Sequence, residues 1–363
     1  MNTTADLHHS PLEASTTAAG ARFAEFSGWS MPLEYAGGGV LAEHEAVRGA
    51  VGLFDVSHLG KLHVSGPGAA AYLDTRLAND LGRIGPGQAQ YTLLCTPDGR
   101  GVVDDLIAYL VGPEEVLLVP NAANAATVAA TLRAGAPDGV TIADRHDGYA
   151  VLAVQGPAAP AVVAAWGAPD DLDYMSFAVL PAGTICRTGY SGERGYELIV
   201  PSEQADDVWE GILGVGRPLG IRPCGLAARD TLRTEMGYPL HGQDIGPDIG
   251  PVEAGLSWAI GWDKPAFDGS DGLHATRAAG PSRRARGLLA TGRGIPRPGM
   301  AVVADGAEIG IVTSGTFSPT LKRGIALALL DADAPTDGVG VRIRDRVEPF
   351  DVVKPPFVPT HVR

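Results

Sequence analysis

The chain has 363 residues, 45% hydrophobic and 19% charged, a composition typical of a globular protein with two or three domains. Its net charge of −14 at pH 7 disfavours nucleic acid as a partner, because binding a phosphate backbone requires clustered Lys and Arg. No apolar run approaches the ~18 residues of a membrane span, and the start has no basic and apolar leader, so we expect neither a membrane protein nor a secreted one.

The spacing of cysteines and histidines argues against a disulfide framework and against a metal site. Cys95, Cys186 and Cys224 are odd in number and far apart, as is common in a reducing compartment. None of the nine histidines has a spacing such as H-x-x-x-H, or an H-x-E with downstream cysteines. We therefore expect a cytoplasmic protein without a metal cofactor.

Helix and strand patterns alternate along the first two thirds of the chain, which predicts an α+β fold. The predicted helices are residues 40–52, Asn121–Arg133, Ala158–Trp166, Glu203–Gly214 and Gly225–Met236. The predicted strands are Lys61–Ser65, Gln90–Cys95, Gly101–Val111, Ala150–Val154, Ala182–Cys186 and Leu198–Val200. After Gly242–Pro251, which has too much Gly and Pro to form an element, β-rich runs with a hairpin turn in Val302–Ala307 predict a small all-β domain.

The strand Gly101–Val111 is apolar on both faces apart from two adjacent acids, Asp104 and Asp105. Because adjacent strand residues point to opposite faces, at least one carboxylate projects into apolar surroundings. Such a group is a candidate for proton transfer or for positioning a substrate. The alternative is an acid at the strand edge that caps a turn formed by Gly99 and Gly101.

The segment Arg187–Glu197 has glycines at every third position and two tyrosines, two carboxylates and two arginines, which is typical of a binding loop. We expect Gly189, Gly192 and Gly195 to provide positive φ angles for the turn between two strands. Glu197 then lies on the second strand, where a buried carboxylate needs a partner. It is either paired within the protein or available to bind a ligand.

Arg229 lies near the start of the helix predicted over Gly225–Met236. A cation there gains nothing from the helix dipole, so an acceptor from elsewhere is plausible. One alternative is a surface ion pair with Asp230 or Glu235. The other is a bidentate pair with a buried acid such as Glu197.

Ser57 and His58 are adjacent in Phe54–Gly60 and suggest nucleophilic chemistry. Adjacent residues do not by themselves form a catalytic triad, however, and the chain has no G-x-S-x-G motif. We therefore do not expect a hydrolase.

Taken in chain order, these segments resemble the blocks of a known family, the aminomethyltransferase (T-protein) of the glycine cleavage system, over nearly the whole chain. The resembling segments are Phe26–Leu33, Gly52–Gly60, Gly101–Leu106, Asn121–Asn124, Arg187–Glu197, Gly225–Gly237, Gly255–Trp258 and Ser318–Leu321. The resemblance implies a three-domain folate-binding fold with antiparallel sheets. Residues 1–55 with 146–245 would form the first domain, 56–145 an inserted domain, and 260–363 a β-barrel-like end.

The family transfers the one-carbon unit of S-aminomethyldihydrolipoyl H-protein to tetrahydrofolate, which yields 5,10-methylenetetrahydrofolate, ammonia and dihydrolipoyl H-protein. The resemblance therefore implies tetrahydrofolate as co-substrate and lipoylated H-protein, with the other glycine cleavage components, as partners. Positioning the folate amine against the donated carbon can by itself contribute roughly 7–11 kcal/mol.

The resemblance also implies roles for single residues. Asp105 would be the catalytic residue, orienting the attacking nitrogen, with Asp104 as its structural neighbour. Glu197 would accept hydrogen bonds from the amino-pyrimidine edge of the pterin, and Arg229 would balance its charge. The other residues implied for the folate cleft are Tyr91, Tyr174, Tyr190, Asn121 and Trp258.

Two alternatives stay open at this point. One is another enzyme on the same fold, a folate-dependent demethylase that acts on a sulfonium or methylamine substrate. The other is a non-enzymatic folate-binding assembly factor, which would not need Asp105 or the segment around Arg229.

Overall fold

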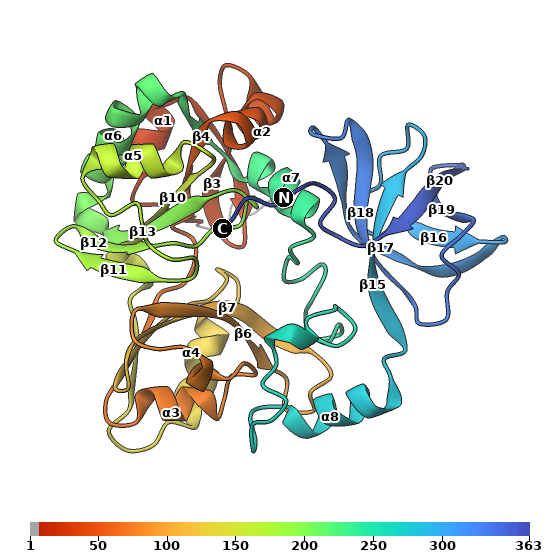
Figure 1. Cartoon of the computed structure of the whole chain (residues 1–363), viewed down its shortest axis with the longest axis horizontal. Helices are drawn as coiled ribbons and strands as arrows, with labels where there is room; N and C mark the ends of the chain where they lie inside the picture. The colour runs from red at the N-terminus through yellow and green to blue at the C-terminus, as the bar shows by residue number, and fades with distance from the viewer. Residues whose placement is uncertain (1–6) are drawn as a thin grey trace, which may run out of the picture.

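The computed structural model of the chain describes residues 7–363, so residues 1–6 of the first predicted domain lie outside the described residues. Three lobes surround a central region, and each lobe is built around its own sheet or barrel (Figure 1). Helices and strands mix in the first two lobes and the last is a closed barrel, which confirms the predicted α+β fold with a β-barrel end. The exact domain boundaries stay a prediction.

The first lobe contains a six-stranded sheet in the order β11-β12-β13-β10-β4-β14. Its strands are β4 (Val51–Asp55), β10 (Tyr149–Gln155), β11 (Phe177–Leu180), β12 (Gly183–Cys186), β13 (Gly195–Pro201) and β14 (Ile221–Cys224). All neighbours are antiparallel except β14 and β4, because the chain crosses back through helix α6 (Ala205–Gly216) before β14. A three-stranded sheet of β1 (His8–His9), β2 (Ala21–Phe26) and β3 (Trp29–Tyr35) completes the strands of this lobe, with β1 and β3 also parallel.

The two faces of the six-stranded sheet pack on different cores. One face, with Leu152, packs against Trp209 and other side chains of α5 (Ala159–Trp166) and α6. The other face, with Ile199, packs against α2 (Gly39–Gly49), α7 (Leu226–Met236) and Tyr109 of the second lobe. Glu197 shares the face of Ile199 because side chains alternate along β13, so its carboxylate points toward the junction of the lobes.

The second lobe contains a five-stranded sheet in the order β6-β7-β8-β5-β9. Its elements are β5 (Leu62–Ser65), α3 (Ala69–Asp74), β6 (Gln88–Cys95), β7 (Val102–Gly112), β8 (Glu115–Val119), α4 (Ala125–Ala134) and β9 (Thr141–Asp144). The chain leaves the first sheet after β4 and returns to it at β10, which is the hydrogen-bonded neighbour of β4. The sheet packs on α3 and α4 through a core that includes Leu73, Val128 and Leu132.

The third lobe is a closed barrel in the order β15-β18-β17-β16-β19-β20, entered through helix α8 (Ser270–Ala279). Its strands are β15 (Arg283–Ala290), β16 (Ala301–Ala304), β17 (Ala307–Ser318), β18 (Arg323–Asp331), β19 (Val339–Ile343) and β20 (Arg346–Val353). After β20 the chain returns to the first lobe (Figure 1), where the backbone N–H of His361 donates to the carbonyl of Gly192 at 2.8 Å. The C-terminal segment therefore joins the barrel to the glycine-rich loop.

Two helices differ more from their predicted bounds than the others do, for local reasons. The helix predicted from Asn121 begins at Ala125, because the backbone and side chain of Asn121 are hydrogen-bonded to Asp104. The helix predicted over residues 40–52 ends at Gly49, because Val51–Asp55 is buried throughout as strand β4.

Candidate active site

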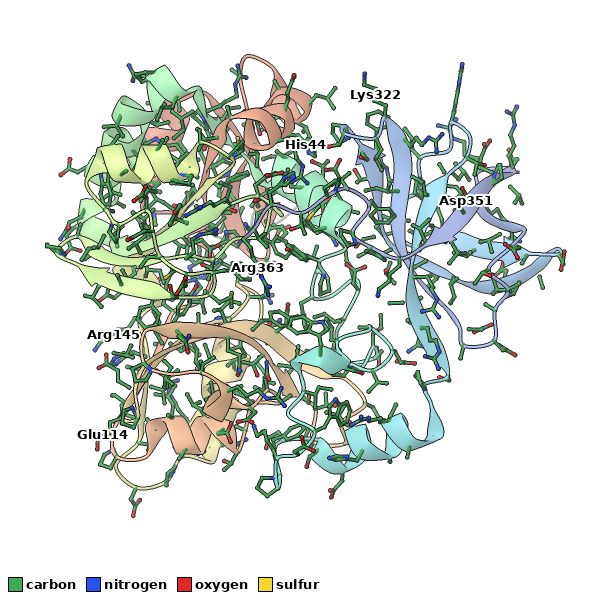
Figure 2. All side chains as sticks on the ribbon, in the orientation of Figure 1. His44, Glu114, Arg145, Lys322, Asp351 and Arg363 are labelled. Atoms are coloured by element: carbon green, nitrogen blue, oxygen red, sulfur yellow. The ribbon has the colours of Figure 1, made fainter. Side chains whose placement is uncertain are left out.

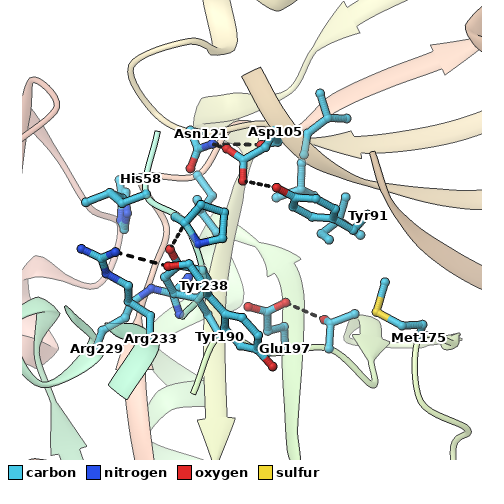
Figure 3. Close-up of a pocket in the computed structure, with 18 of the residues that line it drawn as sticks. His58, Tyr91, Asp105, Asn121, Met175, Tyr190, Glu197, Arg229, Arg233 and Tyr238 are labelled. Atoms are coloured by element: carbon cyan, nitrogen blue, oxygen red, sulfur yellow. Dashed lines mark hydrogen bonds between the residues drawn. The ribbon is translucent and has the colours of Figure 1, made fainter. Parts of the chain in front are cut away.

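A cavity of about 260 Å³ lies where the lobes meet. Side chains from β7, the β12–β13 loop, α7 and residues 238–240 form much of its wall. Every residue predicted for the site lines it: Tyr91, Asp105, Asn121, Tyr174, Tyr190, Glu197, Arg229 and Trp258. Figure 3 shows Asp105 and Asn121 on one side of the cavity, across from Glu197 and Arg229.

The side-chain amide of Asn121 donates hydrogen bonds to both Asp104 and Asp105. Nδ2 of Asn121 donates to Oδ1 of Asp104 at 2.9 Å and to Oδ1 of Asp105 at 2.8 Å. Asp104 is fully buried and accepts further hydrogen bonds, from the backbone of Asn121 at 3.0 Å and from Nδ2 of Asn124 at 2.7 Å. A β-bulge at Val103 precedes both acids, and from Asp104 onward the pairing is regular, so the predicted alternation between the two acids holds. The Asp104 carboxylate is thus hydrogen-bonded within the protein, whereas Asp105 lines the cavity.

The pKa values of Asp104 and Asp105 are both raised. Burial raises the pKa of both carboxyl groups, and the charge of Asp105 raises the pKa of Asp104 further. Hydrogen bonds from Tyr91 and Asn121 act in the opposite direction on Asp105. Two acids this close titrate as a pair. A carboxyl group with a raised pKa can take up or release a proton closer to neutral pH than an ordinary aspartate can.

Tyr91 and Trp258 extend the wall next to Asp105. The hydroxyl of Tyr91 donates to Oδ2 of Asp105 at 3.0 Å. The indole of Trp258 stacks on the Tyr91 ring with centroids 5.4 Å apart, and this tryptophan is 64% exposed. An aromatic surface therefore leads from solvent to the Asp105 carboxylate, which suits a flat heteroaromatic ligand.

Glu197 is held by Thr188, a residue that the sequence did not indicate. The Thr188 hydroxyl donates to Oε2 of Glu197 at 2.5 Å, across the glycine-rich loop. Glu197 is only 9% exposed, and its carboxylate has no ion pair with any side chain of residues 7–363. Both explanations for Glu197 thus hold in part: the protein gives it one hydrogen bond, and its remaining acceptor capacity faces the cavity.

The three glycines of the loop have different roles. Only Gly192 has a positive φ, of 82°, whereas Gly189 and Gly195 do not need one, which corrects the prediction that all three do. A Cβ at Gly189 or Gly195 would lie 2.1 Å or 2.3 Å from atoms of the Gln155 side chain. These two positions are glycine because the loop passes directly over Gln155, a contact that sequence spacing cannot reveal.

Arg229 pairs with an aromatic ring and not with an acid. Its guanidinium lies 4.6 Å from the centroid of the Tyr190 ring. Neither proposed ion pair forms, with Glu197 or with a surface acid, in the part of the chain that the structure describes. The Tyr190 hydroxyl donates to the carbonyl of Pro239, which fixes the ring under the cation. The charge of Glu197 still raises the pKa of Arg229, against a larger lowering by burial.

Tyr174 lies at the edge of the cavity and is 37% exposed. The guanidinium groups of Arg187 and Arg363 lie 6.0 Å and 5.9 Å from its ring centroid. Nη2 of Arg187 donates to the carbonyl of Val362 at 2.6 Å. The C-terminal residue, which Figure 2 labels near the centre of the molecule, therefore contributes to this edge.

Arg233 in the cavity wall and His241 behind it were not predicted as site residues from the sequence. Arg233 is buried, donates to Asp244 at 2.8 Å and to Ser314 of the barrel at 2.9 Å, and lines the cavity. His241 approaches Nδ2 of Asn124 at 3.0 Å and thereby reaches the network of Asp104. Of the two, only Arg233 could have been predicted, because it lies one helical turn after Arg229 on the same face of α7.

No cluster of three or more His, Cys, Asp or Glu side chains suited to a metal ion occurs within residues 7–363. No helix in the same range is long and apolar enough to cross a membrane.

Comparisons with known proteins agree along the whole chain. A family model described as the GCVT N-terminal domain matches residues 12–264, and one described as the glycine cleavage T-protein C-terminal barrel domain matches residues 283–359. An aminomethyltransferase of Frankia alni is 60% identical over 99% of this chain and all of the relative, and one of Mycobacterium tuberculosis is 53% identical over all of both chains.

A solved structure gives the same result for the fold. The crystal structure of the glycine cleavage system aminomethyltransferase T from Bartonella henselae superposes with a TM-score of 0.92 and 35% identity, over 98% of this chain and 99% of that one. Sequence and fold thus agree from the first sheet to the barrel. The chain belongs to the glycine cleavage T-protein family of aminomethyltransferases.

Proposed function

We propose that this aminomethyltransferase moves the one-carbon unit from S-aminomethyldihydrolipoyl H-protein to tetrahydrofolate. In the balanced reaction the C–S and C–N bonds of the donor break, and the carbon forms bonds to N5 and N10 of the folate. The two protons that these nitrogens lose appear on ammonia and on the dihydrolipoyl thiol. The observation that supports this proposal most is the single cavity that joins Asp105, Glu197 and Arg229 with stacked aromatic rings.

Asp105 is the group proposed to orient the attacking nitrogen. Its carboxylate is anchored by Tyr91 at 3.0 Å and by Asn121 at 2.8 Å, so it has one geometry before any ligand arrives. Holding a nucleophile at the right distance from carbon replaces an encounter in solution by a step within one complex. A raised pKa also suits a carboxyl group that receives a proton from an amine during the transfer.

Glu197 and Arg229 are proposed to hold the pterin from its other side. The amino-pyrimidine edge of a pterin presents adjacent N–H donors, which match a fixed carboxylate. Glu197 is fixed by Thr188, and Arg229 lies over the Tyr190 ring. Tyr174, at the cavity edge, and Trp258, which also lines the cavity, are proposed to contact the benzoyl part of the folate.

Replacing Glu197 by Gln should raise the dissociation constant for tetrahydrofolate about 10- to 100-fold, since the variant loses charge-assisted hydrogen bonds of roughly 1.5–3 kcal/mol. Titration calorimetry measures the constant directly. Glu203→Gln, an exposed carboxylate just after β13, is the matched control and should bind like the wild type. An unchanged constant for Glu197→Gln would remove this residue from pterin recognition.

Ammonia release tests the reaction as a whole. Lipoylated H-protein loaded with the aminomethyl group should release ammonia rapidly when both this enzyme and tetrahydrofolate are present. Without the folate, release should be much slower. No ammonia with a competent carrier would contradict the proposal, and demethylation of a sulfonium or methylamine substrate under the same conditions would favour the alternative enzyme.

The proposed setting of the reaction is the cytoplasm, together with the other glycine cleavage components. The three cysteines, Cys95, Cys186 and Cys224, are free and buried, as suits a reducing compartment. The net charge of −14 argues against nucleic acid as a partner. No residue is assigned to a metal in this mechanism.

A further inference from the structure

His58 is a polar side chain of the cavity wall that the reaction proposed above leaves unused. The residue is 3% exposed and lines the cavity. Its Nδ1 is enclosed without a hydrogen-bond partner, and no side chain or backbone group of residues 7–363 binds Nε2 either. Nearly all buried polar groups in proteins are hydrogen-bonded, so an exception in a ligand cavity points to a ligand.

Several hydrogen bonds hold the backbone of the segment that carries His58. The carbonyl oxygen of His58 accepts a hydrogen bond from Nε2 of His146 at 2.9 Å. Before it, the backbone N–H of Ser57 donates to Asp55 at 2.9 Å, and Nζ of Lys61 donates to the Ser57 carbonyl at 2.7 Å. These hydrogen bonds hold the backbone at His58 in place, and the imidazole packs edge-on against the Phe26 ring with centroids 5.3 Å apart.

The charges around His58 restrict what can bind next to it. Burial lowers the pKa of His58 well below its usual value, and the positive charges of Arg229 and Lys61 lower it further. A neutral imidazole offers one N–H donor and one acceptor nitrogen. His58 and Arg229 lie on the same side of the cavity in Figure 3, with Glu197 and Tyr91 toward the other. A cationic group would be repelled from this corner, whereas a neutral ring with a polar edge would not.

Building on the proposed function, we infer that His58 is a positioning residue for tetrahydrofolate, whose reduced pterin it hydrogen-bonds through a ring nitrogen beside Arg229. The pterin is neutral and carries N–H donors as well as carbonyl and ring-nitrogen acceptors on its edges. Glu197 takes the amino-pyrimidine edge, and His58 takes polar atoms that a carboxylate acceptor cannot satisfy. The protonatable amine of the one-carbon donor belongs elsewhere in the cavity, away from the Arg229 charge.

Two substitutions of His58 test this inference. His58→Leu should raise the dissociation constant for tetrahydrofolate about tenfold, because a buried hydrogen bond is lost. His58→Gln should keep most of the affinity, because an amide also donates and accepts. Turnover at saturating folate should change less than the affinity in both variants. The control is His63→Leu on strand β5, which lies outside the cavity and should bind folate like the wild type.

The outcomes separate this inference from the proposed function. If the wild type binds tetrahydrofolate and both His58 variants bind it equally well, the role of His58 is refuted and the reaction stands. A raised KM for loaded H-protein with unchanged folate affinity would also refute it, since His58 would then serve the donor. If the wild type binds no folate, the proposed function itself fails. In nitrogen-15 spectra of labelled histidine, the His58 ring signals should shift when tetrahydrofolate is added, and unshifted signals would count against the contact.

Discussion

Replacing Asp105 by Asn should lower turnover about 10²- to 10⁴-fold, the usual contribution of a positioned acid or base, while tetrahydrofolate still binds. The variant has nearly the same shape but no charge, and its amide cannot take up the proton that the folate amine loses. In addition, Tyr91 and Asn121 both donate to the Asp105 carboxylate, so the amide of the variant must turn its NH₂ toward one of two donors. Single-turnover ammonia release and a separate folate titration measure the two quantities.

The control for this experiment is Asp138→Asn, an exposed carboxylate of the second lobe, which should turn over like the wild type. If Asp105→Asn keeps wild-type turnover, Asp105 has no part in the mechanism. If the variant loses folate affinity and turnover by the same factor, Asp105 acts in binding alone. Asp104→Asn would test the hydrogen-bond network behind the site and not the transfer step. That buried acid contacts Asn121 and Asn124 and lies outside the cavity wall.

The largest expected effect on stability is that of Glu235→Gln, at the contact between α7 and the barrel. Glu235 is fully buried and accepts hydrogen bonds from Ser318 at 2.5 Å and from the Thr320 hydroxyl at 3.0 Å. Arg48 forms an ion pair with it at 2.8 Å, and His44, which Figure 2 labels near this boundary, lies 3.3 Å away. Removing one member of a buried charged network costs about 3–5 kcal/mol, because the remaining charge is left without its partner. Urea unfolding at pH 7 measures the loss.

The same residue should produce a defined pH dependence. Burial alone raises the pKa of Glu235, but hydrogen bonds from His44 and Ser318 and the charge of Arg48 outweigh it and lower the pKa to about 2. A folded-state pKa below the ordinary value of 4.5 means that the stabilisation is complete above pH 4.5 and is lost as the pH falls toward 2. The difference corresponds to about 3 kcal/mol. Glu235→Gln should lack this part of the acid sensitivity.

Glu308→Gln is the matched control for both measurements. Its ion pair with Arg342 has exposed partners, at 62% and 45% of their side-chain surface, so its removal should change stability by less than about 1 kcal/mol. Equal stability of Glu235→Gln and Glu308→Gln would mean that the network at the barrel contact contributes little. Unchanged acid sensitivity in Glu235→Gln would assign the acid transition to other groups.

The sequence predicted the elements of the fold well, because periodicity is a local property. Strand alternation alone placed Glu197 on one face of β13 with Ile199, and the β-rich runs after Arg286 predicted an all-β domain, which the structure shows to be a closed barrel. The β-bulge at Val103 could not be predicted in this way, since it depends on pairing between β6 and β7. The parallel edge strand β14 likewise follows from a crossover, which periodicity does not specify.

The candidate site was predicted in its residues but not in its contacts. The order of motifs along the chain led to the eight residues, and all of them line one cavity. Their partners were found only in the structure. Thr188 holds Glu197 from across a loop, and Arg229 stacks on Tyr190 where an ion pair was expected. Hydrogen-bond and stacking partners depend on how the loops fold, and single-sequence spacing carries little information about that.

By itself, then, the sequence determined the alternating strands, the helix spacing of α7 and the adjacency of Asp104 and Asp105, since each depends on neighbours along the chain. The tertiary structure alone decided which of the two acids faces the cavity and that Gly189 and Gly195 must make room for Gln155. It also decided that the imidazole of His58 is buried without a hydrogen-bond partner among residues 7–363. These features depend on burial, and burial arises only when segments distant in the sequence pack together.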